Sequence, residues 1–77
     1  MTQAERDFCM YWKGMCGQFM IRIIEAFFEA DTENTIRLSL GFPEVGEVIN
    51  RYHNESGYWQ DLIERWNKEY PHSPIRG

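Results

Sequence analysis

The chain has 77 residues, of which 43% are hydrophobic and 16% aromatic, and its formal net charge at pH 7 is −4. The length predicts a single domain spanning residues 1–77, and the aromatic content argues against a disordered chain, because disordered segments are poor in aromatic residues. The acidic balance argues against direct nucleic-acid binding, since contacts with a phosphate backbone depend on basic residues.

Residues 3–30 predict one long N-terminal helix, because apolar residues recur there at the spacing of a helical face. That face comprises Phe8, Trp12, Met15, Phe19, Ile23 and Ala26 or Phe27. The opposite, polar stripe is narrow and comprises Gln18, Arg22, Glu25 and Glu29. Gly14 and Gly17 interrupt the pattern, and each costs up to about 1 kcal/mol inside a helix. They indicate a kink, a break near 14–17, or the close approach of another backbone.

Three apolar residues, Ile21, Ile24 and Phe28, lie beside the polar stripe of this helix. A helix that is apolar around most of its circumference is either central in its domain or shared with another chain. One interpretation is therefore a homo-oligomer interface formed by these three residues.

Residues 32–40 predict a short second helix. Asp31 or Thr32 can cap it, and Gly41 ends it. The alternation of Ile36, Leu38 and Leu40 is typical of a strand, but no other segment alternates, so a strand here would lack a partner.

Pro43 suits the first turn of a third helix, because its missing N–H would be unpaired there. Val45, Val48, Ile49 and Tyr52 form its apolar face.

A fourth helix is predicted over 57–70, with Ser56 as its cap. Its apolar face comprises Trp59, Leu62, Ile63, Trp66 and Tyr70. Pro71 ends it, and 71–77 form a C-terminal tail. The predicted fold is therefore all-α, with one long N-terminal helix and three shorter helices packed on it.

Candidate catalytic and metal-binding groups do not form a known pattern. Cys9 and Cys16 lie about 10.5 Å apart along a continuous helix, too far for a disulfide, and we interpret both as buried structural residues. With His53 and His72 they lack the close ligand pairs of zinc sites. We therefore expect no enzyme activity, no metal and no cofactor.

The N-terminus and the apolar runs bear on localisation. The polar start "MTQAERDF" is unlike a signal peptide, and the longest apolar runs are far too short to span a membrane. We expect a cytoplasmic protein without membrane contacts.

The nine residues "RYHNESGYW" at 51–59 are the strongest candidate site. They join the third and fourth helices, so one interpretation is simply a packed corner. The other is a patch for a protein partner, because Tyr, Trp and Arg are enriched at interaction hot spots. The candidate residues of this patch are Arg51, Tyr52, His53, Tyr58 and Trp59, with Glu44, Glu47 and Glu55 nearby.

Several features of residues 27–66 occur together: the aromatic pair before Ala30, the run "GFPE" at 41–44 and the run "GYW" at 57–59, with Asn34, Leu38 and Tyr52. In these features the chain resembles small helical proteins of unknown function encoded by bacteriophages and other mobile elements. The resemblance implies an accessory protein in a bacterial cytoplasm that binds a host or phage protein, in some cases to block a defence system. It carries no catalytic residue.

Two other functions fit the same sequence. A small-ligand or nucleotide binder at an oligomer interface would use Arg22, Arg37 and Arg51 to hold an anion. A self-assembling structural protein would use the long helix.

Overall fold

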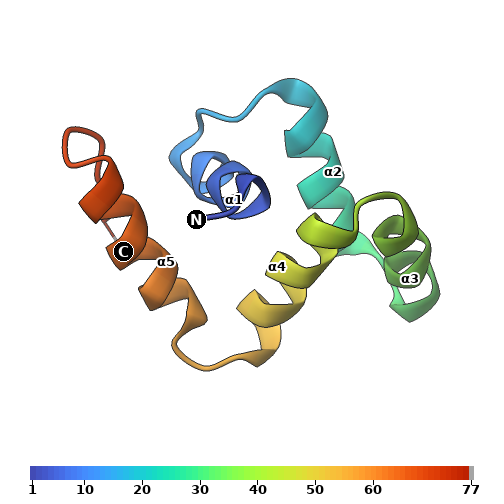
Figure 1. Ribbon diagram of the computed structural model, residues 1–77. Coiled ribbons are helices and arrows are strands. Elements are labelled where there is room, and N and C mark those ends of the chain that lie inside the picture. The colour runs from blue at the N-terminus through green and yellow to red at the C-terminus, as the bar shows by residue number, and fades with distance from the viewer. Residues whose placement is uncertain (77) are drawn as a thin grey trace.

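The computed structural model describes residues 1–76, which form five helices of 10 to 12 residues each (Figure 1). The helices are α1 (Gln3–Lys13), α2 (Gln18–Glu29), α3 (Thr32–Gly41), α4 (Pro43–Asn54) and α5 (Tyr58–Glu69). No strand occurs within residues 1–76, so the all-α prediction is confirmed.

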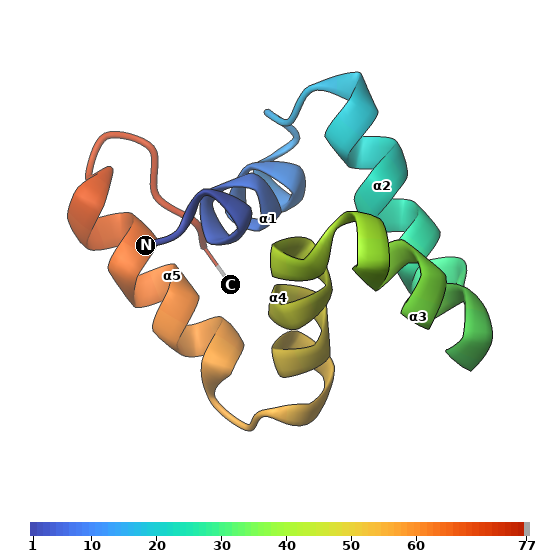
Figure 2. The ribbon, with the colours of Figure 1, turned by 45° about the vertical axis from the view of Figure 1, so that its right-hand side comes forward.

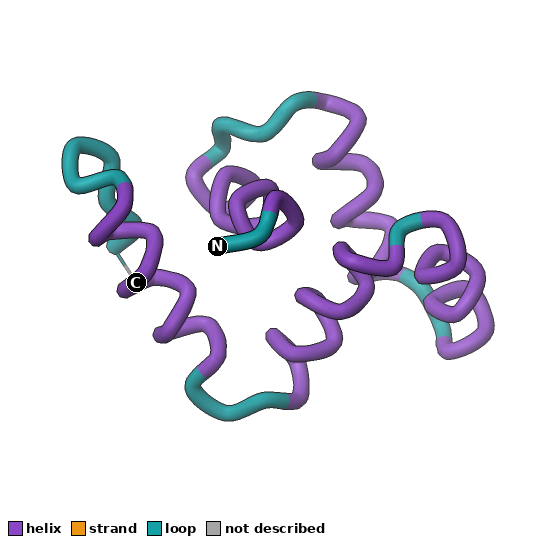
Figure 3. Tube along the Cα trace, in the orientation of Figure 1, coloured by secondary structure: helices purple, strands orange, loops and turns teal. Residues whose placement is uncertain are grey.

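The prediction of one long N-terminal helix is wrong, because the helix ends at Lys13 and a new one begins at Gln18. Figure 3 shows the intervening loop between α1 and α2. Gly14 has a φ of 72°, in the left-handed region. Its N–H donates to the carbonyl of Tyr11 at 3.1 Å, and the N–H of Met15 donates to that of Met10 at 2.9 Å. This pair of hydrogen bonds is the Schellman motif, which commonly ends a helix at a glycine.

The break changes which residues of the predicted apolar face are buried. Phe8 and Phe27 are in the core, as expected. Trp12, Met15 and Phe19, however, are 48%, 56% and 65% exposed. The reason is that the loop turns α2 away from the axis of α1, so one straight stripe no longer faces one core.

The other helix boundaries lie close to their predicted positions. The Asp31 side chain accepts a hydrogen bond from the N–H of Asn34 at 2.8 Å and caps α3, and Pro43 occupies the first turn of α4. The predicted cap of the fourth helix is wrong, because Gly57 precedes α5, with a φ of 85° and no side-chain cap. The left-handed backbone makes glycine the suitable residue there.

The core lies where α1 meets α2, α4 and α5. α3 packs only on α2 and α4 and contributes no buried residue, and Figure 2 shows it on the side of the molecule remote from α5. The most deeply buried side chains are Phe8, Cys9, Ile24 and Leu62. Ile24, predicted at an oligomer interface, is therefore a core residue.

The C-terminal segment is packed rather than free. Ile75 is only 9% exposed and belongs to the core. The Asn67 side chain brackets Ile75, accepting from its N–H at 2.7 Å and donating to its carbonyl at 3.1 Å. The Trp66 indole donates to the Ser73 carbonyl at 2.7 Å, so residues up to Ile75 are part of the domain.

Both cysteines are free, but they differ in environment. Cys9 is fully buried, and burial together with nearby Glu5 raises the pKa of its thiol to about 11. Cys16 lies in the loop between α1 and α2 and is partly exposed, so the prediction of two buried cysteines holds for Cys9 alone. Among the helices of residues 1–76, none has the length and apolar character that a membrane span requires.

Candidate functional site

Aromatic rings from four helices gather on one side of the core, around the buried ring of Phe8. We call the outer rings the aromatic face: Tyr11 and Trp12 from α1, Phe28 from α2, Tyr52 and His53 from α4, and Trp59 from α5. The face therefore depends on how four of the five helices pack together, because segments from residue 11 to residue 59 contribute to it.

Trp12 lies at the open part of the aromatic face. Its ring centroid is 6.1 Å from that of Tyr52 and 5.9 Å from that of Trp59. The rings of Tyr52 and Trp59 meet edge to face at 5.8 Å, and below them Phe8 is 5.1 Å from Tyr52. Such aromatic pairs contribute about 0.5–1.5 kcal/mol each beyond the area they bury. Trp12 is thus held by its neighbours and remains half exposed.

Besides the ring of His53, three polar groups of the aromatic face have no hydrogen-bond partner within the described residues, 1–76. The indole N–H groups of Trp12 and Trp59 and the hydroxyl of Tyr52 make no hydrogen bond there, whereas the indole of Trp66 donates to Ser73. No buried polar side-chain atom of residues 1–76 lacks a partner. The unpaired groups of Tyr52 and Trp59 therefore reach solvent, and Trp12 is itself 48% exposed, so a binding partner can contact this part of the face.

A second, polar site lies between the start of α1, α4 and α5. We call it the polar pocket, with a volume of about 310 Å³. Its lining comprises Thr2, Glu5, Glu44, Glu47, Val48, Arg51, Tyr58 and Arg65. No residue of the aromatic face lines it.

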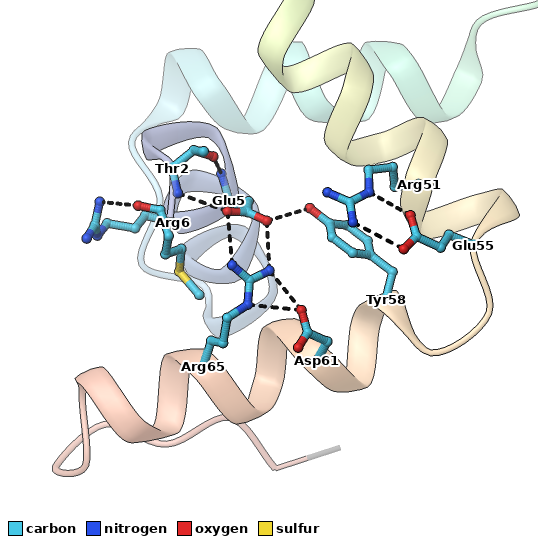
Figure 4. Close-up of polar contacts among 9 residues, drawn as sticks. Thr2, Glu5, Arg6, Arg51, Glu55, Tyr58, Asp61 and Arg65 are labelled. Atoms are coloured by element: carbon cyan, nitrogen blue, oxygen red, sulfur yellow. Dashed lines mark hydrogen bonds and ion pairs between the residues drawn. The ribbon is translucent and has the colours of Figure 1, made fainter.

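Glu5 holds the polar pocket together, as Figure 4 shows. Its carboxylate accepts from the Tyr58 hydroxyl at 2.8 Å, from Arg65 at 2.9 Å and from the Thr2 N–H at 2.9 Å. The Thr2 hydroxyl in turn accepts from the Glu5 N–H at 3.1 Å, which completes a capping box at the start of α1. Glu5 thereby both caps α1 and ties it to α5.

The environment of Glu5 keeps its carboxylate charged. Burial by itself would raise its pKa, but the hydrogen bonds from Arg65, Thr2 and Tyr58 and the charge of Arg65 outweigh burial and lower the pKa to about 2. The pKa of Tyr58 is raised by burial and by its hydrogen bond to Glu5. Tyr58 therefore remains a neutral hydrogen-bond donor to Glu5 at physiological pH.

The predicted patch at 51–59 is divided between the two sites. Tyr52, His53 and Trp59 belong to the aromatic face. Arg51 and Tyr58 line the polar pocket, where the Arg51 guanidinium lies 4.0 Å from the centroid of the Tyr58 ring. Tyr58 is 2% exposed, so its side chain is almost entirely covered by the protein itself.

The three glutamates of the predicted patch, Glu44, Glu47 and Glu55, lie at or beside the polar pocket and not in the aromatic face. Glu44 and Glu47 line the polar pocket and make no ion pair within residues 1–76. Glu55 forms two hydrogen bonds with Arg51, at 2.6 and 3.1 Å. The interaction patch predicted from the sequence is thus two separate surfaces.

Sequence reasoning missed the roles of three residues: Glu5, Arg65 and Trp12. Glu5 could have been found from the spacing Thr2-x-x-Glu5, which is the signature of a capping box. Its partner Arg65 is 60 positions away and left no local signal. Trp12 was assigned to the core because the break after Lys13 was not resolved from the pattern.

The residues predicted for ligand binding and for an oligomer interface do not come together in common sites. Arg37 pairs with Glu33 and lines a pocket between α2 and α3, whereas Arg51 pairs with Glu55 and lines the polar pocket. Of the predicted oligomer-interface residues, Phe28 joins the aromatic face, while Ile24 is in the core and Ile21 is half-buried. Within residues 1–76, no three His, Cys, Asp or Glu side chains gather as a metal site would require.

No family model, no curated protein and no solved structure matches this chain.

Proposed function

We propose that this protein is a non-enzymatic binding module that contacts another protein through the aromatic face. The observation that carries the proposal is Trp12, a large aromatic side chain that is 48% exposed yet packed at its edges by Tyr52 and Trp59. A tryptophan held in place before binding loses little conformational freedom when a partner covers it, so more of its contact energy is available for binding.

The composition of the aromatic face supports a protein partner. Trp and Tyr are the residue types most enriched at the energetic centres of protein interfaces. The open donors of Trp12, Tyr52 and Trp59 can pair with carbonyl groups of a partner, while their rings supply apolar area. The exposed His53 lies beside Phe28, with ring centroids 5.7 Å apart, at the polar edge of the face.

The resemblance in residues 27–66 to phage and mobile-element proteins supports a biological setting for this activity. We propose that the partner is a protein of a bacterial host, and that the module acts as an accessory protein, for example by blocking a defence protein. Self-assembly through the aromatic face is the competing outcome.

A capture experiment tests the proposal. The tagged chain and a Trp12→Ala variant are each incubated with bacterial lysate, and proteins that elute in stoichiometric amount are identified by mass spectrometry. We expect one host protein to co-elute with the wild-type chain and to be lost with Trp12→Ala, because truncation of a hot-spot tryptophan weakens binding by roughly 30-fold or more.

The matched control is Phe19→Ala, which removes another exposed aromatic ring. Phe19 is 65% exposed and packs against Phe42, away from the aromatic face. The control variant should still capture the partner. Equal loss with both variants, or equal capture with both, would contradict the assignment of binding to the aromatic face.

A further inference from the structure

The loop between α1 and α2 breaks the helix, but the helical spacing of apolar residues in the sequence continues through it. The helical spacing of Phe8, Trp12, Met15, Phe19 and Ile23 continues through residues 14–17. These four loop residues are close to the 3.6 residues of one helical turn. The apolar stripe therefore keeps its phase across the loop, and a straight helix over 3–29 would place all five residues on one face.

The loop has the features of a hinge. Gly14 is in the left-handed region at φ 72°, whereas Gly17 has a φ of −66° and an extended ψ of 154°. A Cβ added at Gly17 would meet no atom within 4 Å. Glycine has more backbone conformations open to it than other residues have, and the apolar side chains beside these two glycines, Met15 and Phe19, are left largely exposed.

The segment before the hinge, α1, is the part of the chain that two copies can exchange with each other. α1 supplies Phe8 and Cys9 to the core and Glu5 to the polar pocket. The helices that it contacts are α2, α4 and α5. A second copy of the chain offers the same three helices, so α1 of one copy can make all of these contacts with its partner.

We propose that residues 14–17 are a hinge through which two copies of this chain exchange α1. In the exchanged dimer residues 3–29 form one helix, and every contact of α1 with α2, α4 and α5 is made between chains. The two hinges lie beside the two-fold axis of this dimer, where each hinge contacts the same residues of its partner. Met15 and Phe19 of the two copies then cover one another. This inference concerns self-association and does not depend on the proposed binding partner.

Two substitutions at Gly17 are expected to shift the equilibrium between monomer and exchanged dimer in opposite directions. Gly17→Ala favours the continuous helix, because alanine is preferred over glycine inside a helix by roughly five-fold, or roughly 25-fold for the two chains of a dimer. Gly17→Pro favours the loop, because φ −66° suits proline. The N–H of Gly17 donates to no backbone carbonyl in the loop, but a continuous helix would need it.

The hinge is tested by measuring the oligomeric state of four chains: wild type, Gly17→Ala, Gly17→Pro and Gly41→Ala. The measurement is size-exclusion chromatography with light scattering over a range of protein concentrations. The wild-type chain should form a dimer whose fraction rises with concentration, Gly17→Ala a larger fraction and Gly17→Pro none. Gly41→Ala is the matched control, since it also has open space around the added Cβ but lies outside the hinge, and it should behave as wild type. Equal dimer fractions in all four chains would overturn the proposal.

A second experiment separates exchange from side-by-side association. Arg6 of α1 and Glu69 of α5 form a partly exposed ion pair at 2.7 Å. One chain carrying Arg6→Cys is refolded together with another carrying Glu69→Cys, both with Cys16→Ala and Gly17→Ala, and a short thiol crosslinker is added. Exchange predicts a crosslink between the two chains at these positions. A dimer without that crosslink would show that the copies associate without exchanging α1.

Discussion

At the scale of single residues, Glu5 is the centre of the hydrogen-bond network in the polar pocket. It is the one buried charged residue of the described chain, at 5% exposure, and its partners come from both ends of the sequence. An isolated buried carboxylate would be strongly unfavourable. Here Thr2, Tyr58 and Arg65 all donate to it, so the charge joins α1 to α5.

Replacement of this carboxylate should therefore destabilise the protein without changing its shape. We expect Glu5→Gln to lower the free energy of unfolding by about 1–3 kcal/mol, because the hydrogen bonds to a charged acceptor are weakened. Urea denaturation followed by circular dichroism measures this change. Gln3→Ala, on the exposed side of the same helical turn, should change stability far less, and equal effects of the two variants would contradict this role of Glu5.

The lowered pKa of Glu5 also predicts a pH dependence. Its pKa is about 2 in the folded protein, against an ordinary value of 4.5. A group whose pKa is lowered by folding stabilises the protein fully above its ordinary pKa and loses that contribution as the pH falls toward the folded pKa. Stability should thus decline between about pH 5 and pH 2.

The pKa values of Glu55 and Glu69 are also lowered, by Arg51 and Arg6 respectively, and they contribute in the same direction. The contribution of Glu5 to the pH dependence of the free energy of unfolding is measured by comparing wild type with Glu5→Gln in urea titrations at several pH values. The two stability curves should converge as the pH falls. Curves that stay parallel would show that Glu5 does not cause the decline.

At the scale of helices, local signals predicted most of the boundaries. Asp31 and Pro43 act within one turn of the chain, so their effect could be inferred without knowledge of the fold. The break after Lys13 also had a local signal, since a basic residue followed by glycine is typical of a helix C-terminus. The apolar stripe outweighed that signal because a four-residue loop does not shift the phase of a 3.6-residue repeat.

The packing of the C-terminal segment could not be predicted in this way. Ile75 is a single apolar residue among polar and proline residues, and its segment is held by the two hydrogen bonds between Asn67 and Ile75 and by the one from Trp66 to Ser73. Such contacts between a helix and a segment beyond its end have no periodic pattern in the sequence.

The role of Asn67 leads to a prediction at this scale. Asn67→Ala should lower the free energy of unfolding by about 1–2 kcal/mol, because the two backbone groups of Ile75 lose their partners. It should also speed hydrogen exchange of the Trp66 indole, which NMR spectroscopy measures directly. Lys68→Ala is the matched control on the exposed side of α5. An indole that exchanges equally slowly in both variants would contradict this role of Asn67.

At the scale of the whole molecule, the sequence drew attention to residues 51–59 but did not predict how their side chains are grouped. Tyr52 and Arg51 are neighbours in the chain, yet they project from α4 toward different sites. Which side chain joined which site depended on the positions of α1 and α5. Phe8 and Trp12 complete the aromatic face around Tyr52, whereas Glu5 and Arg65 complete the polar pocket beside Arg51.

This division gives the two sites distinct expected roles. Two charged residues that line the polar pocket, Glu5 and Arg51, are already paired within the protein, with Arg65 and Glu55 respectively, so we expect this site to act mainly on stability. The aromatic face has open donors and a half-exposed tryptophan, and we propose that it acts on binding. A variant of either site should therefore affect one property and largely spare the other.

The most direct test is the affinity of the captured partner for two variants, measured by isothermal titration calorimetry. Trp12→Ala alters the aromatic face, and Arg51→Ala alters the polar pocket at a partly exposed position. We predict that Trp12→Ala raises Kd by roughly 30-fold or more, and that Arg51→Ala changes it by less than about five-fold, as expected for a partly exposed charge. If Arg51→Ala abolished binding while Trp12→Ala bound as wild type, the binding site would be the polar pocket and the proposal would be wrong.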